Sequence, residues 1–132
     1  MLTDKIKAFT DAGAIGLMST VLPSGHLQNQ PVWVDTDGEH ILVNTEIERR
    51  KFKNLQENPH VTVTIMDSSN PWSWSEIRGE MIDAIHGQEA RDHIDKLART
   101  YLGVDEYPNP ISSPRVIVKI APHQVFEFPP GQ

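Results

Sequence analysis

Four positive charges within five residues are the strongest chemical signal in the sequence: Arg49, Arg50, Lys51 and Lys53. Thr45 and Glu48 have the spacing of a capping box, so we expect a helix that begins just after Thr45 and ends at Asn58-Pro59. Positive charge in a first helical turn opposes the helix dipole by roughly 0.3–1 kcal/mol per charge. A bound anion would compensate it, because helix N-terminal amides and nearby Arg or Lys bind phosphate. The alternative is a solvated basic face paired with neighbouring glutamates.

Other chemistries find little support in the sequence. The six histidines do not have the spacing of three or four converging metal ligands, so no metal site is expected. No serine lies in a nucleophile elbow, and no glycine-rich phosphate loop is present. The carboxylates of Asp35 and Asp37, and of Asp105 and Glu106, have the character of turn or surface residues. We therefore predict no catalytic side chain.

Three tryptophans, Trp33, Trp72 and Trp74, are the second notable feature. Trp33 lies in a predicted strand, where core packing and ring stacking on a ligand are equally good interpretations. Trp72 and Trp74 lie in or beside a loop, where large aromatic residues often meet a ligand or a partner subunit. Together with a phosphate site, these residues would suit a planar aromatic cofactor that carries a phosphate.

Length and composition limit the class of protein. A chain of 132 residues suits one domain, spanning residues 1–132. A net charge of −6 and a pI near 5.4 argue against binding to nucleic acid or to an anionic membrane. The absence of cysteine, of a long apolar run and of a signal-peptide pattern leads us to expect a soluble, cytoplasmic protein.

Hydrophobic periodicity predicts short strands around two further helices. Helices are expected at 3–13 and at 90–103. Strands are expected at 14–22, 28–35, 41–45, 60–67, 72–86 and 116–120, with a possible extension at 123–128. The first three would form a meander that leads into the basic helix, Pro31 would lie at an edge or bulge, and the long strand would bend at Gly79. This pattern predicts a mainly β fold with flanking helices, a small antiparallel barrel of six or seven strands.

An ordered set of short motifs resembles the pyridoxamine 5'-phosphate oxidase-like split-barrel superfamily, and within it the small flavin- and coenzyme F420-dependent oxidoreductases. The motifs cover nearly the whole chain: Ser19-Thr20, Gln30-Pro-Val-Trp-Val34, Thr45, Arg49-Arg-Lys-Phe-Lys-Asn-Leu55, Asn58-Pro59, Asp67, Asn70-Pro71, Glu76-Ile-Arg-Gly79 and Tyr101-Leu-Gly103. The resemblance implies a split β-barrel that forms a homodimer, with a cofactor at each of two subunit interfaces.

The resemblance also implies roles for particular residues. Arg50 and Lys51 occupy the place of the pair that binds the FMN phosphate in the oxidases. In the F420-binding relatives, alternating cations hold the phosphate and acidic tail; here these are Arg49, Lys51 and Lys53, with Asn54 beside them. Positions that line the ring system correspond to Ser19, Thr20, Pro31, Val32, Trp33 and Thr45. Positions that can reach cofactor or substrate, including from the partner chain, correspond to Trp72, Trp74 and Arg78.

The chain lacks the C-terminal arginine motif with which the true oxidase binds its phosphorylated substrate, so oxidation of pyridoxamine phosphate is not expected. The leading hypothesis is an oxidoreductase that binds coenzyme F420 and transfers a hydride to a small unsaturated or aromatic acceptor. The alternatives are an FMN-binding reductase or oxidase of the same fold, a non-catalytic carrier of flavin or F420, and an interaction domain without a cofactor.

Overall fold

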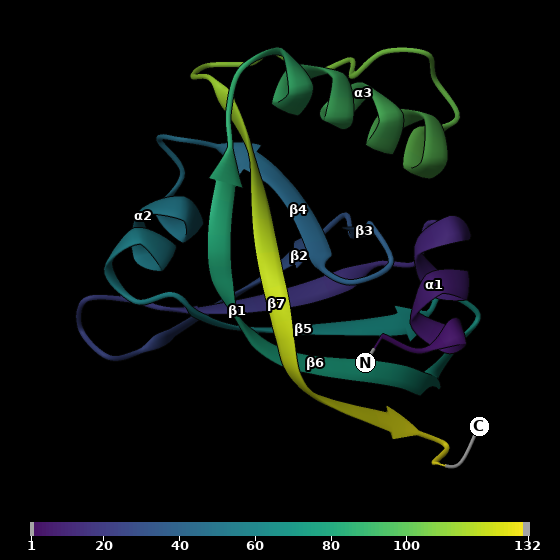
Figure 1. The fold of residues 1–132 in the computed structure, drawn as a ribbon. Coiled ribbons are helices and arrows are strands. Elements are labelled where there is room, and N and C mark those ends of the chain that lie inside the picture. The colour runs from purple at the N-terminus through teal and green to yellow at the C-terminus, as the bar shows by residue number, and fades with distance from the viewer. Residues whose placement is uncertain (1, 131–132) are drawn as a thin grey trace.

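The computed structural model describes residues 2–130, which form three helices and one antiparallel sheet of seven strands (Figure 1). The helices are α1 (Asp4–Asp11), α2 (Arg50–Glu57) and α3 (Gln88–Leu102). The strands are β1 (Gly16–Val21), β2 (Leu27–Val32), β3 (Asp35–Thr36), β4 (Ile41–Glu46), β5 (His60–Asp67), β6 (Asn70–Ile85) and β7 (Arg115–Phe128). Their order in the sheet is β2-β1-β5-β6-β7-β4-β3. The predicted mainly β, antiparallel fold is confirmed.

The sheet curls into a half-barrel because its two edges are joined by a very short link. Strands β2 and β3 lie at opposite edges, yet only Trp33 and Val34 separate them in the chain. The hydroxyl of Tyr101, in α3, ties this link to the segment before β1: it accepts a hydrogen bond from the Val34 amide at 2.9 Å and donates to the Ala14 carbonyl at 2.7 Å. Burial raises the pKa of the Tyr101 hydroxyl, which keeps the donor proton in place.

The Tyr101 hydroxyl gives a first prediction. Tyr101→Phe leaves the Val34 amide and the Ala14 carbonyl without this partner, and we expect a loss of about 1–2 kcal/mol in the free energy of unfolding. Urea denaturation of both proteins measures it. Tyr107→Phe is the matched control, since the hydroxyl of Tyr107 has no hydrogen bond among residues 2–130. Equal losses in the two variants would contradict the role of the Tyr101 hydroxyl.

The predicted three-strand meander is wrong. Strand β4 does not pair with β2 but lies between β3 and β7 at the far side of the sheet. Two causes are visible. Strand β2 ends just after Pro31, which cannot donate to a further ladder and lies on an edge strand as expected. The apolar residues of β4, Ile41 and Val43, pair with Ile120 and Val118 of β7 and are buried with them.

The predicted capping box is also wrong. Thr45 belongs to β4, and α2 begins only at Arg50, with Arg49 as an N-cap whose side chain makes no capping hydrogen bond. The strand continues to Glu46, which pairs with Arg115 of β7 and is 2% exposed. This pairing delays the start of the helix by four residues. The predicted end of the helix, at Asn58 before Pro59, is confirmed.

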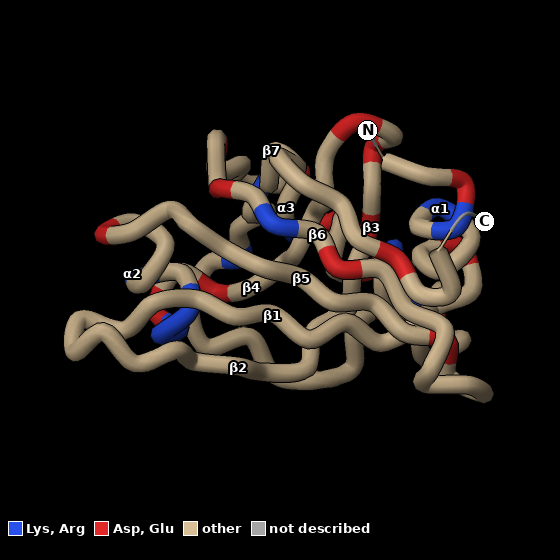
Figure 2. Tube along the Cα trace, turned by 90° about the horizontal axis from the view of Figure 1, so that it is seen from below, with Lys and Arg blue, Asp and Glu red and all other residues tan. Residues whose placement is uncertain are grey.

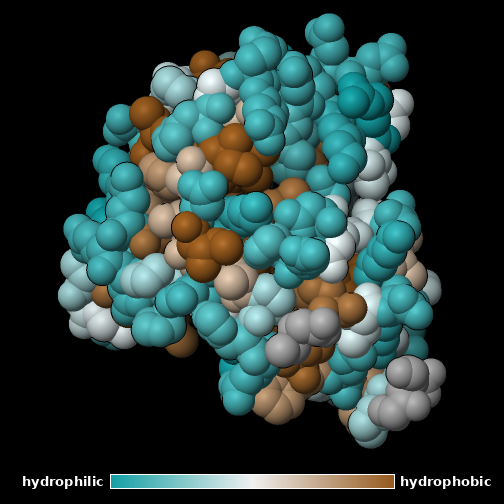
Figure 3. Space-filling model, in the orientation of Figure 1, coloured by the Kyte–Doolittle hydropathy of each residue, from teal (hydrophilic) through white to brown (hydrophobic). Residues whose placement is uncertain are grey.

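The remaining elements match the sequence pattern closely. Helix α1 begins at the Thr3 cap, and α3 ends at Gly103, whose φ of 69° is in the left-handed region. The long strand β6 shifts register between Arg78 and Gly79, at the predicted bend. Helix α3 covers one end of the sheet, over β4 and β7 (Figure 1). The face shown in Figure 3 is mainly hydrophilic, with apolar side chains in separate patches.

No helix within residues 2–130 combines the length and the apolar character that crossing a lipid bilayer requires.

Candidate functional site

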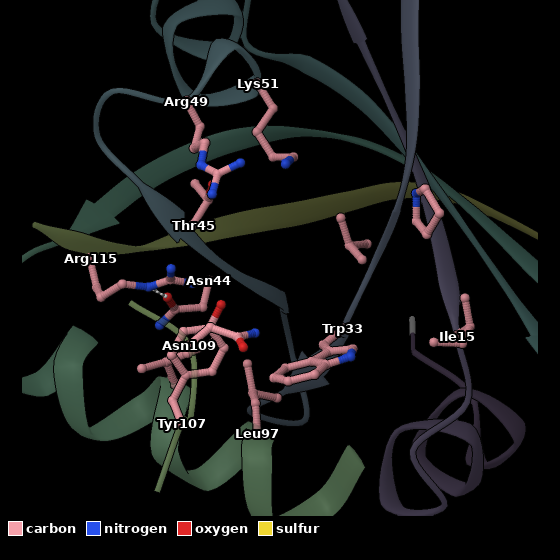
Figure 4. Close-up of a pocket in the computed structure, with 13 residues that line it drawn as sticks. Ile15, Trp33, Asn44, Thr45, Arg49, Lys51, Leu97, Tyr107, Asn109 and Arg115 are labelled. Carbon is pink, nitrogen blue, oxygen red and sulfur yellow. Dashed lines mark hydrogen bonds between the residues drawn. The ribbon is translucent and has the colours of Figure 1, made fainter. Parts of the chain in front are cut away.

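A pocket of about 260 Å³ lies between the start of α2, strands β2 and β4, and helix α3 with the loop that follows it (Figure 4). Six of the residues predicted from the sequence line it: Pro31, Val32, Trp33, Thr45, Arg49 and Lys51. They come from three separate segments of the chain. The fold therefore brings four of the six predicted ring-lining residues and two of the predicted cations to one place.

Helix α2 directs its cations into this pocket because its opposite face is anchored in the core. Phe52 and Leu55 are 3% and 1% exposed, and they fix the rotation of the helix. Arg49 and Lys51 then extend from its first turn toward the pocket (Figure 4). In Figure 2 the start of α2 is a basic segment close to β1, with which the helix is in contact.

The charged end of the pocket contains more positive than negative charge. Three cations, Arg49, Lys51 and Arg115, line it. The buried carboxylate of Glu46 lies 3.3 Å from Arg115 and 3.9 Å from Arg49. Burial by itself would raise the pKa of Glu46, but hydrogen bonds from Ser113 and the two arginines lower it, so this carboxylate is charged. Three cations and one anion leave two net positive charges, 3 − 1 = 2.

The excess of positive charge in the pocket affects Lys51 most directly. Burial lowers the pKa of its ammonium group, and the charges of Arg49 and Arg115 lower it further. In the part of the chain that the structure describes, no acidic side chain lies within ion-pair distance of Lys51. An anion in the pocket would relieve this repulsion, which is the compensation that the sequence led us to expect.

The other end of the pocket is aromatic and apolar. The ring of Trp33 stacks on Tyr101, with centroids 5.2 Å apart, and meets Tyr107 edge-on at 6.1 Å. Ile94 and Leu97 of α3 line the same end. Trp33 is partly buried by its aromatic neighbours and also lines the pocket, so core packing is confirmed for part of its surface and stacking on a ligand stays a prediction. The pocket thus places a flat apolar wall beside a cationic end.

Three predicted site residues form a hydrogen-bond network outside the pocket. The Asn54 side chain is 0% exposed; it accepts from Arg50 Nε at 2.9 Å and donates to Thr20 Oγ1 at 3.1 Å. This network fastens α2 to β1. Lys53 points away and pairs with Glu48 at 3.3 Å. Within this chain, therefore, Thr20, Arg50, Lys53 and Asn54 do not line the pocket.

The other predicted residues lie on outer surfaces of the sheet. Ser19 donates to Asn29 on an exposed face. Trp74 stacks on Phe128 with centroids 6.2 Å apart. Arg78 pairs with Glu76 and lies over the ring of Phe126 at 4.4 Å. The structure does not bring Ser19, Trp74 and Arg78 to the pocket of the same chain.

Several pocket residues were missed by the sequence interpretation: Asn44, Tyr107, Asn109 and Arg115. Arg115 had a usable signal, since it is a charged residue immediately before the apolar run Val116–Val118. Tyr107 and Asn109 lie in the proline-rich connection after α3, where no periodicity indicates which way a side chain points.

Behind the pocket, Asp35 accepts hydrogen bonds from His93 and Lys96, both at 3.0 Å. Burial by itself would raise the pKa of Asp35, but these two bonds, together with a hydrogen bond from the Thr36 backbone and the charge of Lys96, lower the pKa from 3.8 to about 2. The stabilisation from Asp35 is therefore complete above pH 3.8 and disappears as the pH falls through about 2.

From this shift we predict that Asp35→Asn lowers the free energy of unfolding at pH 7 by about 2 kcal/mol. The difference between variant and wild type should shrink toward zero as the pH falls through about 2. Urea denaturation at pH 7, 4 and 2 measures it. Asp83→Asn, an exposed carboxylate of β6, is the control. A difference that does not change with pH would contradict the prediction.

Comparison with known protein families shows to which family this chain belongs. Residues 2–128 match the family model described as pyridoxamine 5'-phosphate oxidase. The chain belongs to the pyridoxamine 5'-phosphate oxidase family. This family includes oxidoreductases, and its members bind flavins or related cofactors. The resemblance that the motifs indicated is confirmed.

Solved structures agree with membership in the pyridoxamine 5'-phosphate oxidase family. An F420 reductase is 26% identical, with a TM-score of 0.81 over 95% of this chain and 98% of that chain. General Stress Protein 26 from Bacillus anthracis is 19% identical, with a TM-score of 0.71 over 96% and 93%. HutZ, a heme storage protein from Vibrio cholerae, is 16% identical, with a TM-score of 0.64 over 96% and 94%. The last two show the fold alone. Comparison with curated proteins gave no match.

Proposed function

We propose that this protein is an oxidoreductase that binds coenzyme F420 in the pocket described above and transfers a hydride to a small unsaturated or aromatic acceptor. The observation that carries the proposal is the pairing of two uncompensated positive charges with an aromatic wall in one pocket. The similarity to an F420 reductase supports it. We further propose that residues 1–132 act as one domain, in the cytoplasm and without nucleic acid or membrane partners.

The residues of the pocket fit such a cofactor. Arg49 and Lys51 would bind its anionic part, since both cations lack a full complement of negative charge. Trp33 and Leu97 would pack against the ring system and exclude water from one of its faces. The reduced deazaflavin supplies the hydride when it is bound. The chain positions and shields it; no side chain is assigned as proton donor, so the proton would come from solvent.

The orientation of the cations favours F420 over FMN. The FMN-binding pattern uses the adjacent pair Arg50 and Lys51, whereas the F420 pattern uses alternating positions. Here Arg49 and Lys51 line the pocket, and Arg50 turns back to bond Asn54. Lys53, the third alternating position, pairs with Glu48 on the surface and would have to leave that exposed pair to contribute. Exposed ion pairs are worth roughly 0–1 kcal/mol, so this is a small cost.

We also propose that the protein acts as a homodimer through the outer face of β6 and β7. Trp72, Phe126 and Phe128 are 73%, 40% and 46% exposed. They share one face with Trp74, because Trp74 pairs with Phe128 in the sheet and side chains alternate along each strand. Exposed aromatic residues on one face are typical of interfaces. A partner bound there is also the means by which Trp74 and Arg78 could reach a cofactor held by the other subunit.

Titration of the purified protein with F420 and, separately, with FMN tests the function. We expect saturable F420 binding at micromolar concentration, and weaker or no binding of FMN. Reduced F420 should then be oxidised by at least one acceptor in a panel of unsaturated and aromatic compounds. FMN that co-purifies, with no F420 binding, would overturn the proposal in favour of an FMN enzyme. Tight F420 binding with no turnover across the panel would indicate a carrier.

Light scattering during size-exclusion chromatography tests the dimer. The wild type should elute with twice the mass of one chain. Trp72→Ser combined with Phe126→Ser should weaken association, while Leu27→Ser, an exposed apolar residue on β2, should not. A monomeric wild type at micromolar concentration would contradict the proposed dimer.

A further inference from the structure

Arg115 is held at the pocket by two buried anchors. It begins β7 and is 9% exposed. Its Nη1 donates to the Glu46 carboxylate at 3.3 Å, and its Nε donates to Asn44 Oδ1 at 2.8 Å. Its guanidinium also lies over the ring of Tyr107, 5.2 Å from the centroid. These contacts fix the plane of the guanidinium group.

The Asn44 side chain is itself held by hydrogen bonds on the side away from Arg115. Because its Oδ1 accepts from Arg115, its Nδ2 must be the donor on the other side. That nitrogen donates to the Ala90 carbonyl at 2.9 Å and lies 3.0 Å from His93 Nδ1. His93 then accepts at Nδ1 and donates from Nε2 to Asp35 at 3.0 Å. A continuous chain of hydrogen bonds from α3 and β3 thus supports the position of Arg115.

This arrangement leaves one nitrogen of Arg115 for another partner. Among residues 2–130, the hydrogen bonds of Arg115 use Nε and Nη1, and none uses Nη2. Arg115 lines the pocket together with Arg49 and Lys51. If Arg115 served only as a counter-ion for Glu46, its guanidinium would not need a fixed plane. It would also not need an open nitrogen beside two further cations. A guanidinium with two anchored nitrogens and one open nitrogen is preorganised for an anion.

We propose that Arg115 is a third anion-binding residue of this pocket, with Asn44 and Glu46 as its positioning residues. The ligand it serves carries at least two negative charges, such as a phosphate with a second phosphate or a carboxylate, because the three cations exceed Glu46 by two charges. The inference rests on the proposed anion-binding pocket and deepens it. It assigns a ligand contact to β7 at the charged end of the pocket, in addition to those proposed for the start of α2.

The test replaces the buried pair without changing its net charge. Glu46→Gln with Arg115→Met removes one anion and one cation, so the formal charge of the pocket stays the same. The amide oxygen that Glu46→Gln introduces can still accept from the Ser112 and Ser113 amides, as the carboxylate does. Asp37→Asn with Lys119→Met is the matched control: it neutralises a pair 4.0 Å apart, with Lys119 on the same strand but outside the pocket.

Binding of pyrophosphate is measured by calorimetry, and binding of F420 by its fluorescence. The pocket double variant should bind pyrophosphate roughly 10–150-fold more weakly than the wild type, the range for a lost charge-assisted hydrogen bond. The control should match the wild type. Equal pyrophosphate affinity in the pocket variant and the wild type, or no binding by the wild type, would overturn the inference. If the pocket variant binds pyrophosphate more weakly but the wild type does not bind F420, Arg115 is still an anion-binding residue. That result would overturn the proposed function instead.

Arg115→Lys provides a second variant if the double variant does not fold. Its ammonium can still pair with Glu46, so the buried carboxylate keeps a partner. A point charge cannot hold Asn44, Glu46 and a ligand in the geometry of a planar guanidinium. We expect weaker pyrophosphate binding at unchanged net charge. Unchanged affinity would show that Arg115 only balances the charge of Glu46.

Discussion

Gly79→Ala is expected to lower the free energy of unfolding by about 3 kcal/mol or more, one of the largest effects of a single methyl group in this chain. A Cβ at Gly79 would overlap the backbone carbonyl of Ala121 on β7. This obstacle is backbone within a paired strand and cannot rotate away. Strand β6 bends and shifts register at Gly79, so β6 and β7 would have to separate where the sheet curls. Urea denaturation of variant and wild type measures the loss.

Gly16→Ala serves as a comparison with a different obstacle. A Cβ at Gly16 would meet the side chain of Val34, which can be shortened. Val34→Ala should therefore rescue part of the loss in Gly16→Ala, giving a favourable coupling of roughly 0.5–3 kcal/mol in a double-mutant cycle. Ile120→Ala, which removes the Cγ2 methyl that a Cβ at Gly79 would also approach, should show little coupling with Gly79→Ala. A full rescue there would contradict a backbone clash.

Local patterns predicted most of the elements because their physical cause lies within a few residues. The alternation in His60–Asp67 matches a strand buried on one face, and the Thr3 cap and Gly103 mark the helix ends where they occur. Asn58 before Pro59 ends α2 for the same kind of local steric reason. Gly79 marks the bend in β6 because close approach to another backbone requires a missing side chain.

The sequence-based predictions were wrong where pairing with a residue or strand far away in the chain determines the local structure. The Thr45 and Glu48 spacing suits a capping box, but Glu46 binds Arg115, 69 residues away, and keeps Thr45 in a strand. The meander failed for the same reason, since β4 pairs with the C-terminal strand and not with its sequence neighbour β2. Nothing within a local window shows either pairing. Long-range pairing overrides local propensity in both cases.

The sequence predicted several residues that line the pocket but missed residues such as Arg115 and Asn44. Charge clustering identified Arg49 and Lys51, and strand position identified Trp33, all of which line the pocket. Charge clustering could not show that Arg50 turns toward Asn54, because adjacent helical residues point about 100° apart and the rotation of α2 is set by Phe52 and Leu55 in the core. Arg115 was missed because its partners come from other segments.

Lys51→Met is expected to weaken binding of F420 by roughly 1.5–3 kcal/mol, or about 10–150-fold, while making the free protein more stable. Burial and the charges of Arg49 and Arg115 lower the pKa of Lys51, so its ammonium is held against repulsion in the free protein. Methionine keeps an unbranched apolar side chain and removes the charge. Relief of the repulsion should add about 0.5–1 kcal/mol to the free energy of unfolding. Fluorescence titration and urea denaturation measure the two effects.

The dependence of binding on pH separates Lys51 from a general loss of charge. In the wild type, affinity should fall as the pH rises through the lowered pKa of Lys51, because the deprotonated amine no longer attracts the anion. Lys51→Met should lose this alkaline step. Lys7→Met, which removes the same charge from the exposed side of α1, should retain both the step and the wild-type affinity. A Lys51→Met protein that gains stability but binds as tightly as the wild type would show that the repulsion at Lys51 has no role in ligand binding.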